Sequence, residues 1–261
     1  MTTIRVRRDR PTALAWSAAL TLTMLAVYVL TLRAAQPDAV ESVSAASRVT
    51  REVTFEAIEA WTVSLARCES AGEARILASG VAQRGAAGLV QRDGEAWRVL
   101  GAAYERRREA ERAAERVAGE GYAAQVVPVS ADAVRLRVTA SEAQIDALVA
   151  ADALLRKQSA ALGDMARQLD KGEMRPEAMR TLCAVAAGEA SDAARALASP
   201  PGAPENALCA GLIERLEVLS GMLGALSESP QTTPEGLSGQ ARCAQLENLL
   251  GQAALQGSLK P

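Results

Sequence analysis

The chain has 261 residues and an almost balanced charge, with 29 Lys and Arg against 31 Asp and Glu, so its composition gives no reason to expect a nucleic-acid partner. Aromatic residues make up only 3% of the chain, which leaves few rings on which bases could stack. Histidine is absent, which excludes histidine-dependent acid–base catalysis and histidine metal sites.

The first 32 residues predict a membrane anchor. Residues 1–10 form a basic tail with four arginines and a single acidic residue, Asp9. Residues 11–32 carry no charge, and a helix of that length spans about 33 Å, enough to cross a bilayer core. The positive-inside rule puts the N-terminus in the cytoplasm and the bulk of the chain outside it. The alternative is a cleaved signal peptide, whose apolar region is usually shorter, about 7 to 15 residues.

A duplication follows the anchor. Residues 33–54 contain Pro, Asp, Ser and Glu without a clear period and are predicted to be a linker. Aligning the chain with itself at an offset of 36 residues, from Glu59 to Val90, gives 14 identities in 32 positions. The matches include Trp61 with Trp97, two of only three tryptophans. We therefore expect two copies of one supersecondary unit.

The first copy reads as strand, helix and strand. Residues 61–66 alternate large apolar side chains with the small side chains of Thr62, Ser64 and Ala66, which is typical of a half-buried strand. Residues 70–73, Ser-Ala-Gly-Glu, have the pattern of a capping box that opens a helix, and Gly85 suits the left-handed position after the helix ends. Residues 86–91 predict the second strand, and Arg-Asp-Gly-Glu at 92–95 predicts a hairpin turn.

The second copy repeats this order. We expect a strand over residues 96–104, a helix over 106–118 and a strand over 123–129. The order βαββαβ gives a four-stranded antiparallel sheet with both helices on one face. Residues 133–139 also alternate and are a candidate fifth strand, so we set the domain at residues 55–139.

The two copies resemble the SPOR (sporulation-related repeat) family. Each half begins with Ala-Trp-x-Val and continues into a helix rich in Glu, Ala and Arg, and residues 97–129, with Gly121-Tyr122 after the helix, form the closer half. The resemblance covers about residues 59–129, roughly a quarter of the chain. It implies binding to septal peptidoglycan, with preference for glycan strands stripped of their stem peptides. It also implies that the glycan lies on the sheet face that the two helices leave uncovered.

Strand parity selects the candidate glycan-binding residues on that face. They are Thr62, Ser64, Arg98, Leu100, Gln125 and Val127. Arg98 matches a commonly basic family position, whereas the family's first-strand Gln, Gly and Phe are replaced by Ser64, Ala66 and Cys68. We expect Arg98 and Ser64 to act as a recognition pair, with the guanidinium on a lactyl carboxylate and the hydroxyl on a sugar hydroxyl. The alternative is that Arg98 is an ordinary solvated surface residue.

Residues 140–261 predict a helical region. Ser141 caps a helix to about residue 169, Pro176 opens a second to about 197, a third runs over 205–226, and Thr233 with Pro234 starts a fourth to about 255. Short connections favour antiparallel neighbours, so we expect a small helical bundle. The cysteines are scattered without a Cys-x-x-Cys pair, and buried thiols are expected rather than disulfides: Cys68, Cys183, Cys209 and Cys243.

These observations predict an α+β protein that is a single-pass membrane protein with its bulk outside the cytoplasm. We expect it to bind peptidoglycan glycan strands at the division or sporulation septum, with the lipid bilayer and other envelope or division proteins as further partners. The alternative is a septal or envelope protein–protein scaffold whose SPOR-like fold has no affinity for glycan. No catalytic or metal-binding constellation is visible, so neither enzymatic activity nor a cofactor is expected.

Overall fold

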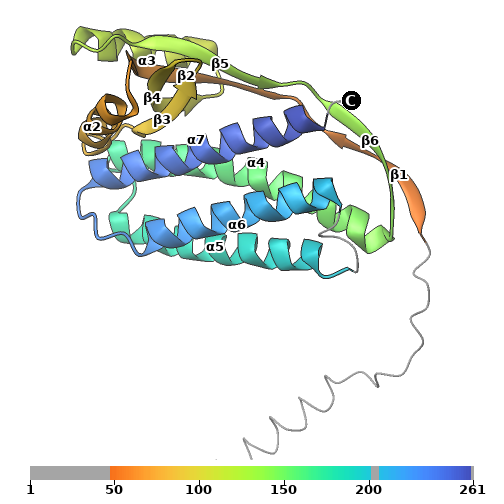
Figure 1. The fold of residues 1–261 in the computed structure, drawn as a ribbon. Coiled ribbons are helices and arrows are strands. Elements are labelled where there is room, and N and C mark those ends of the chain that lie inside the picture. The colour runs from red at the N-terminus through yellow and green to blue at the C-terminus, as the bar shows by residue number, and fades with distance from the viewer. Residues whose placement is uncertain (1–47, 201–205, 260–261) are drawn as a thin grey trace, which may run out of the picture. The chain divides into compact units, whose positions relative to one another are not determined.

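The computed structural model describes residues 48–200 and 206–259, which contain both helices and antiparallel strands in an α+β arrangement (Figure 1). The predicted basic tail, the predicted membrane span at 11–32 and the predicted linker up to residue 47 lie outside the described residues. Within the described part of the chain, none of the helices is both long and apolar enough to cross a bilayer.

The duplicated segment folds with the expected order of elements. They are β2 (Ile58–Cys68), α2 (Ala71–Ala82), β3 (Leu89–Asp93), β4 (Ala96–Tyr104), α3 (Arg107–Gly119) and β5 (Gln125–Ala131). The four strands form an antiparallel sheet in the order β3-β4-β2-β5, so the predicted βαββαβ topology is confirmed. Each copy thus supplies one of the two central strands, β2 and β4, and α2 and α3 pack together on one face of the sheet (Figure 1).

Local chemistry sets the boundaries of these elements. Ser70 accepts a hydrogen bond from the backbone N of Glu73 at 3.2 Å, which caps the first turn of α2 as the sequence predicts. Gly94 has φ +62° in the tight turn between β3 and β4, and Gly85 has φ +92° after α2. Both glycines occupy the left-handed region that residues with a Cβ rarely adopt.

Two further strands form a ribbon outside the four-stranded sheet. β1 (Val49–Phe55) pairs with β6 (Val134–Ala140), so the prediction that residues 133–139 add a fifth strand to that sheet is wrong. The pairing register is the same from the pair Val49/Ala140 to the pair Ser64/Gln125. The ribbon β1/β6 therefore continues the pair β2/β5 in the same register, and strand pairing is interrupted only at residues 56–57.

Strand β1 was not predicted, because almost all of it lies in the segment 33–54 that was predicted to be a linker. Val53 and Phe55 alternate along the strand and are 4% and 3% exposed, buried against the helical region. Arg51 lies on the same side of the strand and pairs with Asp146 at 3.0 Å instead of entering the core. The alternation of apolar and polar residues in this segment is therefore reduced to two consecutive apolar positions, Val53 and Phe55. This pattern is too short to predict a strand.

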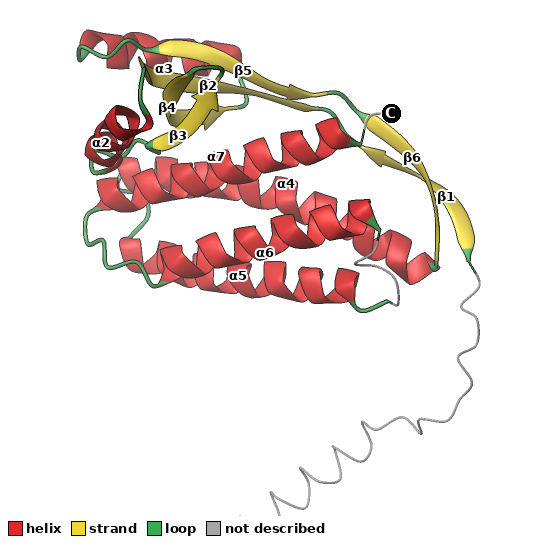
Figure 2. Cartoon of the chain, in the orientation of Figure 1, coloured by secondary structure: helices red, strands yellow, loops and turns green. Residues whose placement is uncertain are grey.

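The C-terminal region is a four-helix bundle, as expected (Figure 2). It consists of α4 (Glu142–Asp170), α5 (Pro176–Ala198), α6 (Ala207–Ser227) and α7 (Pro234–Ser258). Ser141 and Gln144 form a capping box at α4, and Thr233 accepts a hydrogen bond from the backbone N of Gly236 at 3.2 Å at α7. Its core is built mainly from leucines that are fully buried, among them Leu155, Leu162, Leu216, Leu219 and Leu223.

Helix α7 also covers the second face of the four-stranded sheet (Figure 1). Leu246 is fully buried and packs with Leu100 of β4 and Ala87, and Cys243 and Leu250 border this cluster. The opposite side of α7 belongs to the bundle core. The sheet is therefore enclosed between α2 and α3 on one face and α7 on the other. The face on which the resemblance places the glycan is left free by the two helices of the repeat, but α7 of the bundle covers the part around Leu100.

The four cysteines are free thiols, and their burial predicts how they react. Burial raises the pKa of Cys183 to about 11, and Cys209 is only partly buried. A raised pKa lowers the thiolate fraction at pH 8, so Cys183 should react with iodoacetamide about a hundredfold more slowly than an unperturbed cysteine. Mass spectrometry of the native protein should show Cys209 labelled before Cys183, and 8 M urea should abolish the difference. Rapid labelling of Cys183 without urea would contradict the packing of α5.

Candidate ligand-binding surface

Three of the six predicted glycan-binding residues are buried, and one of them, Leu100, packs against Leu246 of α7. Thr62, Ser64 and Leu100 are 1%, 4% and 1% exposed. The Thr62 hydroxyl donates to the backbone oxygen of Val127 at 3.1 Å, and the Ser64 hydroxyl donates to the backbone oxygen of Ala66 at 3.3 Å. These hydroxyl groups already have partners within the sheet, so Ser64 and Arg98 do not form one open recognition surface.

The other three predicted residues are at least partly exposed to solvent. Gln125 is exposed, Val127 is half-buried, and the Arg98 side chain is 25% exposed. Arg98 lies directly opposite Arg67 of β2 and Gln91 of β3. Residues opposite each other in an antiparallel sheet point to the same face. Gln91, Arg98 and Arg67 therefore form a row across three strands, and with Gln125 we call them the strand-end strip.

The charges of the strand-end strip are not balanced. Asp93 Oδ2 lies 2.8 Å from Arg98 Nε and 3.5 Å from Arg67 Nε, so two guanidinium groups share one carboxylate. Like charges on opposite residues of a sheet repel each other, and Asp93 offsets only one of the two. The strip keeps an excess positive charge, and the amides of Gln91 and Gln125 can both donate and accept hydrogen bonds. This chemistry suits an anionic, hydroxyl-rich ligand.

Arg67 and Gln91 were not among the predicted site residues. Strict alternation places Arg67 with Val63 and Leu65 on the face covered by α2 and α3. A bulge in β2 between Val63 and Ala66 shifts the register and turns Arg67 to the other face. The alternation of side chains in the sequence gives no sign of this bulge. A prediction from strict alternation therefore places Arg67 on the wrong face of the sheet.

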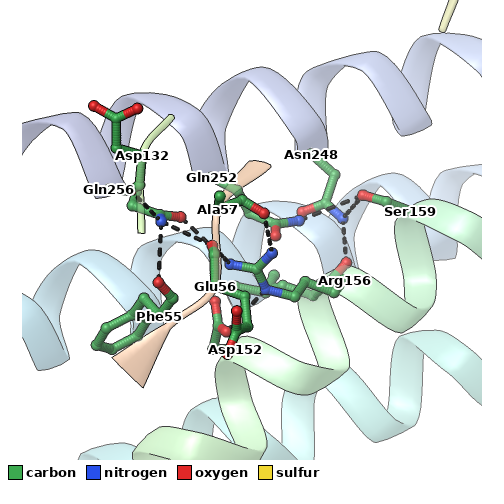
Figure 3. A network of polar contacts seen from close by, with 11 residues as sticks. Phe55, Glu56, Ala57, Asp132, Asp152, Arg156, Ser159, Asn248, Gln252 and Gln256 are labelled. Atoms are coloured by element: carbon green, nitrogen blue, oxygen red, sulfur yellow. Dashed lines mark hydrogen bonds and ion pairs between the residues drawn. The ribbon is translucent and has the colours of Figure 1, made fainter. Parts of the chain in front are cut away.

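A second polar cluster joins the ribbon to the bundle at the interruption between β1 and β2 (Figure 3). Gln256 Nε2 donates to the backbone oxygens of Glu56 and Asp132, both at 2.8 Å. Arg156 Nη2 donates to the same oxygen of Glu56 at 2.6 Å, and Arg156 Nε pairs with Asp152 at 2.9 Å. The two side chains hold the interrupted backbone against α4 and α7, and we call them the ribbon clamp.

The neighbouring turns of α7 continue this buried polar contact (Figure 3). Asn248 is 3% exposed and donates to the backbone oxygen of Leu155 at 2.8 Å and to the Ser159 hydroxyl at 2.7 Å. Asn248, Gln252 and Gln256 follow one another every four residues, so they line one stripe of α7 that faces α4 and the ribbon. This stripe fixes the rotation of α7 and thereby keeps Leu246 against the sheet.

Comparison of the chain with family models, with curated proteins and with solved structures found no match. The function of the strand-end strip is therefore inferred from its chemistry. The strip offers guanidinium and amide groups, which suit the binding of an anionic, hydroxyl-rich ligand.

Proposed function

We propose that this protein is a membrane-anchored, non-enzymatic protein that binds peptidoglycan glycan strands outside the cytoplasm, at the division or sporulation septum. The anchor is the uncharged segment 11–32 behind the basic tail, which lies outside the described residues. The SPOR-like character of the βαββαβ unit is part of the proposal. It is supported by the sequence resemblance and by a sheet whose two central strands come from equivalent halves of the duplication.

The excess charge of the strand-end strip is the observation that carries the proposal. A glycan strand that has lost its stem peptides offers free lactyl carboxylates beside hydroxyl and acetamido groups. Arg67 and Arg98 share a single carboxylate, so the pair retains capacity for another anion. The exposed amides of Gln91 and Gln125 lie on the same face and suit the neutral groups of the sugar.

The proposal predicts that the double variant Arg67→Ala/Arg98→Ala loses glycan binding. Residues 48–261 can be sedimented with isolated sacculi before and after amidase treatment, which removes the stem peptides. The parent should bind the treated sacculi better, and the variant should bind at least about tenfold more weakly, near the loss of one charge-assisted hydrogen bond. Both substitutions lie at partly exposed sites, so unfolding in urea should be nearly unchanged.

Arg135→Ala/Arg137→Ala is the matched control for this experiment. Arg135 and Arg137 are exposed arginines on β6, in the ribbon outside the four-stranded sheet. Their removal takes away the same two charges without touching the strip, so binding to sacculi should stay at the parental level. If the double variant binds treated sacculi as well as the parent does, the strip is not the glycan site.

A protein–protein scaffold without glycan affinity is the second candidate, and the position of α7 favours it. The helix packs against the sheet face that the resemblance assigns to glycan and buries Leu100 there. A parent protein that fails to sediment with either form of sacculi, while it still localises to the septum of living cells, would select this candidate.

A further inference from the structure

A cavity of about 290 Å³ opens between α2 and α3, on the face of the sheet opposite to the strand-end strip. Its floor consists of Val63, Leu65 and Gly101, and Ala113 contributes from α3. Gly101 makes room for the Leu65 side chain, because a Cβ at this position would lie 3.0 Å from three of the Leu65 carbon atoms. The volume is at the low end of the range for small-molecule pockets, and the floor is apolar.

The rim of this cavity gathers arginines from three separate elements. Arg84 follows α2, Arg116 lies on α3, and Arg242 comes from α7. Arg242 is held in place by Asp170 and by the backbone oxygen of Gly85, both within hydrogen-bonding distance. The remaining two are less tightly held, since Arg84 is exposed and Arg116 makes neither an ion pair nor a hydrogen bond with the residues that the structure describes.

Aromatic groups stand beside these cations. The guanidinium of Arg84 lies 5.6 Å from the ring centre of Tyr122, which orients it at the rim. Tyr104 also lines the cavity; its hydroxyl is protonated at neutral pH, as in any tyrosine, and burial raises its pKa further, so it can donate a hydrogen bond. The cavity thus combines an apolar floor, two tyrosine side chains and cationic groups at its opening.

The charges at the rim favour an anion. Its three arginines, Arg84, Arg116 and Arg242, face two acidic lining residues, Glu120 and Asp170, and Asp170 is already paired with Arg242. An unoccupied space left by imperfect core packing would be lined by apolar groups and closed to solvent, whereas this one is open and ringed by guanidinium groups. An inorganic anion would satisfy the rim and leave the apolar floor unfilled.

We propose that this cavity binds a carboxylate attached to an apolar or aromatic body, with the carboxylate on Arg84 and Arg116 and the body against the apolar floor of Val63 and Leu65. Two sources carry this chemistry, a free organic acid and the C-terminal end of a peptide. The site lies across the sheet from the strand-end strip, so it is independent of the proposed glycan binding.

The proposal can be tested by nitrogen-15 NMR titration of residues 48–261, whose cooperative thermal unfolding is verified first. The probes are 4-phenylbutyrate, its neutral amide and butyrate. 4-Phenylbutyrate should change the chemical shifts of the backbone amides of Gly85, Gly101 and Ala102. The neutral amide, which lacks the charge, and butyrate, which lacks the aromatic body, should bind at least about tenfold more weakly. The tripeptide Ala-Ala-Phe and its C-terminal amide distinguish the two sources, because only a peptide-end site prefers the free tripeptide over 4-phenylbutyrate.

A double variant with a matched control tests the assignment to this cavity. Arg84→Gln/Arg116→Gln should weaken binding of 4-phenylbutyrate about tenfold. Arg75→Gln/Arg112→Gln removes two exposed arginines, one on α2 and one on α3, that do not line the cavity. This control should leave binding unchanged. Equal binding of the acid and its amide, equal effects of the two double variants, or no shift at 10 mM of any probe would overturn the proposal.

Discussion

Replacing Gly239 with alanine should lower the free energy of unfolding by about 2 to 3 kcal/mol, the range for overpacking a close contact. Gly239 lies in α7, where the chain passes closest to the end of α2. A Cβ at this position would lie 2.6 Å from the backbone oxygen of Ala82 and 2.7 Å from that of Ala86. Backbone atoms cannot rotate away as a flexible side chain would, so α7 would have to move off the sheet.

The matched control is Gly221→Ala in α6. No atom lies within 4 Å of a Cβ placed on Gly221, so the change should follow helix propensity alone and stabilise the protein by about 0.5 to 1 kcal/mol. Urea unfolding of both variants measures the difference. If the two substitutions change stability in the same direction, α7 does not approach α2 as closely as the structure places it.

The elements that the sequence predicted well are those whose signals are local. The capping residues Ser70, Ser141 and Thr233 each stand at the start of a helix, and all three accept a hydrogen bond from the first turn. The 36-residue repeat predicted the βαββαβ order, because each copy carries its own strand, cap and turn residues. Such features depend on a few neighbouring residues and are visible in one sequence.

The features that the sequence did not predict depend on contacts between distant segments. Helix α7 has two apolar sides, with Leu237 and Ala244 toward the bundle and Cys243, Leu246 and Leu250 toward the sheet. The second stripe, at spacings of three and four residues, was the one available signal that a further surface is buried. The sequence could not say that this surface is the four-stranded sheet, and three of the six candidate site residues, predicted to be open, are therefore buried.

The ribbon clamp carries the second large effect. Gln256→Ala should lower the free energy of unfolding by about 3 kcal/mol, because it removes the donor that bonds the backbone oxygens of Glu56 and Asp132 in a buried site. Arg156→Ala should cost about 2 kcal/mol, since its guanidinium also bonds Glu56 and pairs with Asp152 at a partly exposed site. Glu247→Ala, an exposed change on the same helix, should stay within about 0.5 kcal/mol of the parent.

The two clamp residues should also depend on each other. Arg156 and Gln256 both donate to the backbone oxygen of Glu56, and Arg156 Nη2 lies 3.4 Å from Gln256 Oε1. The loss of either side chain therefore leaves the other as the remaining donor to Glu56, and the double variant should differ from the sum of the single variants by about 1 kcal/mol. Urea unfolding of the parent, both single variants and the double variant supplies this cycle. Strict additivity would mean that the two side chains act at separate places and that no shared contact holds the interrupted ribbon to the bundle.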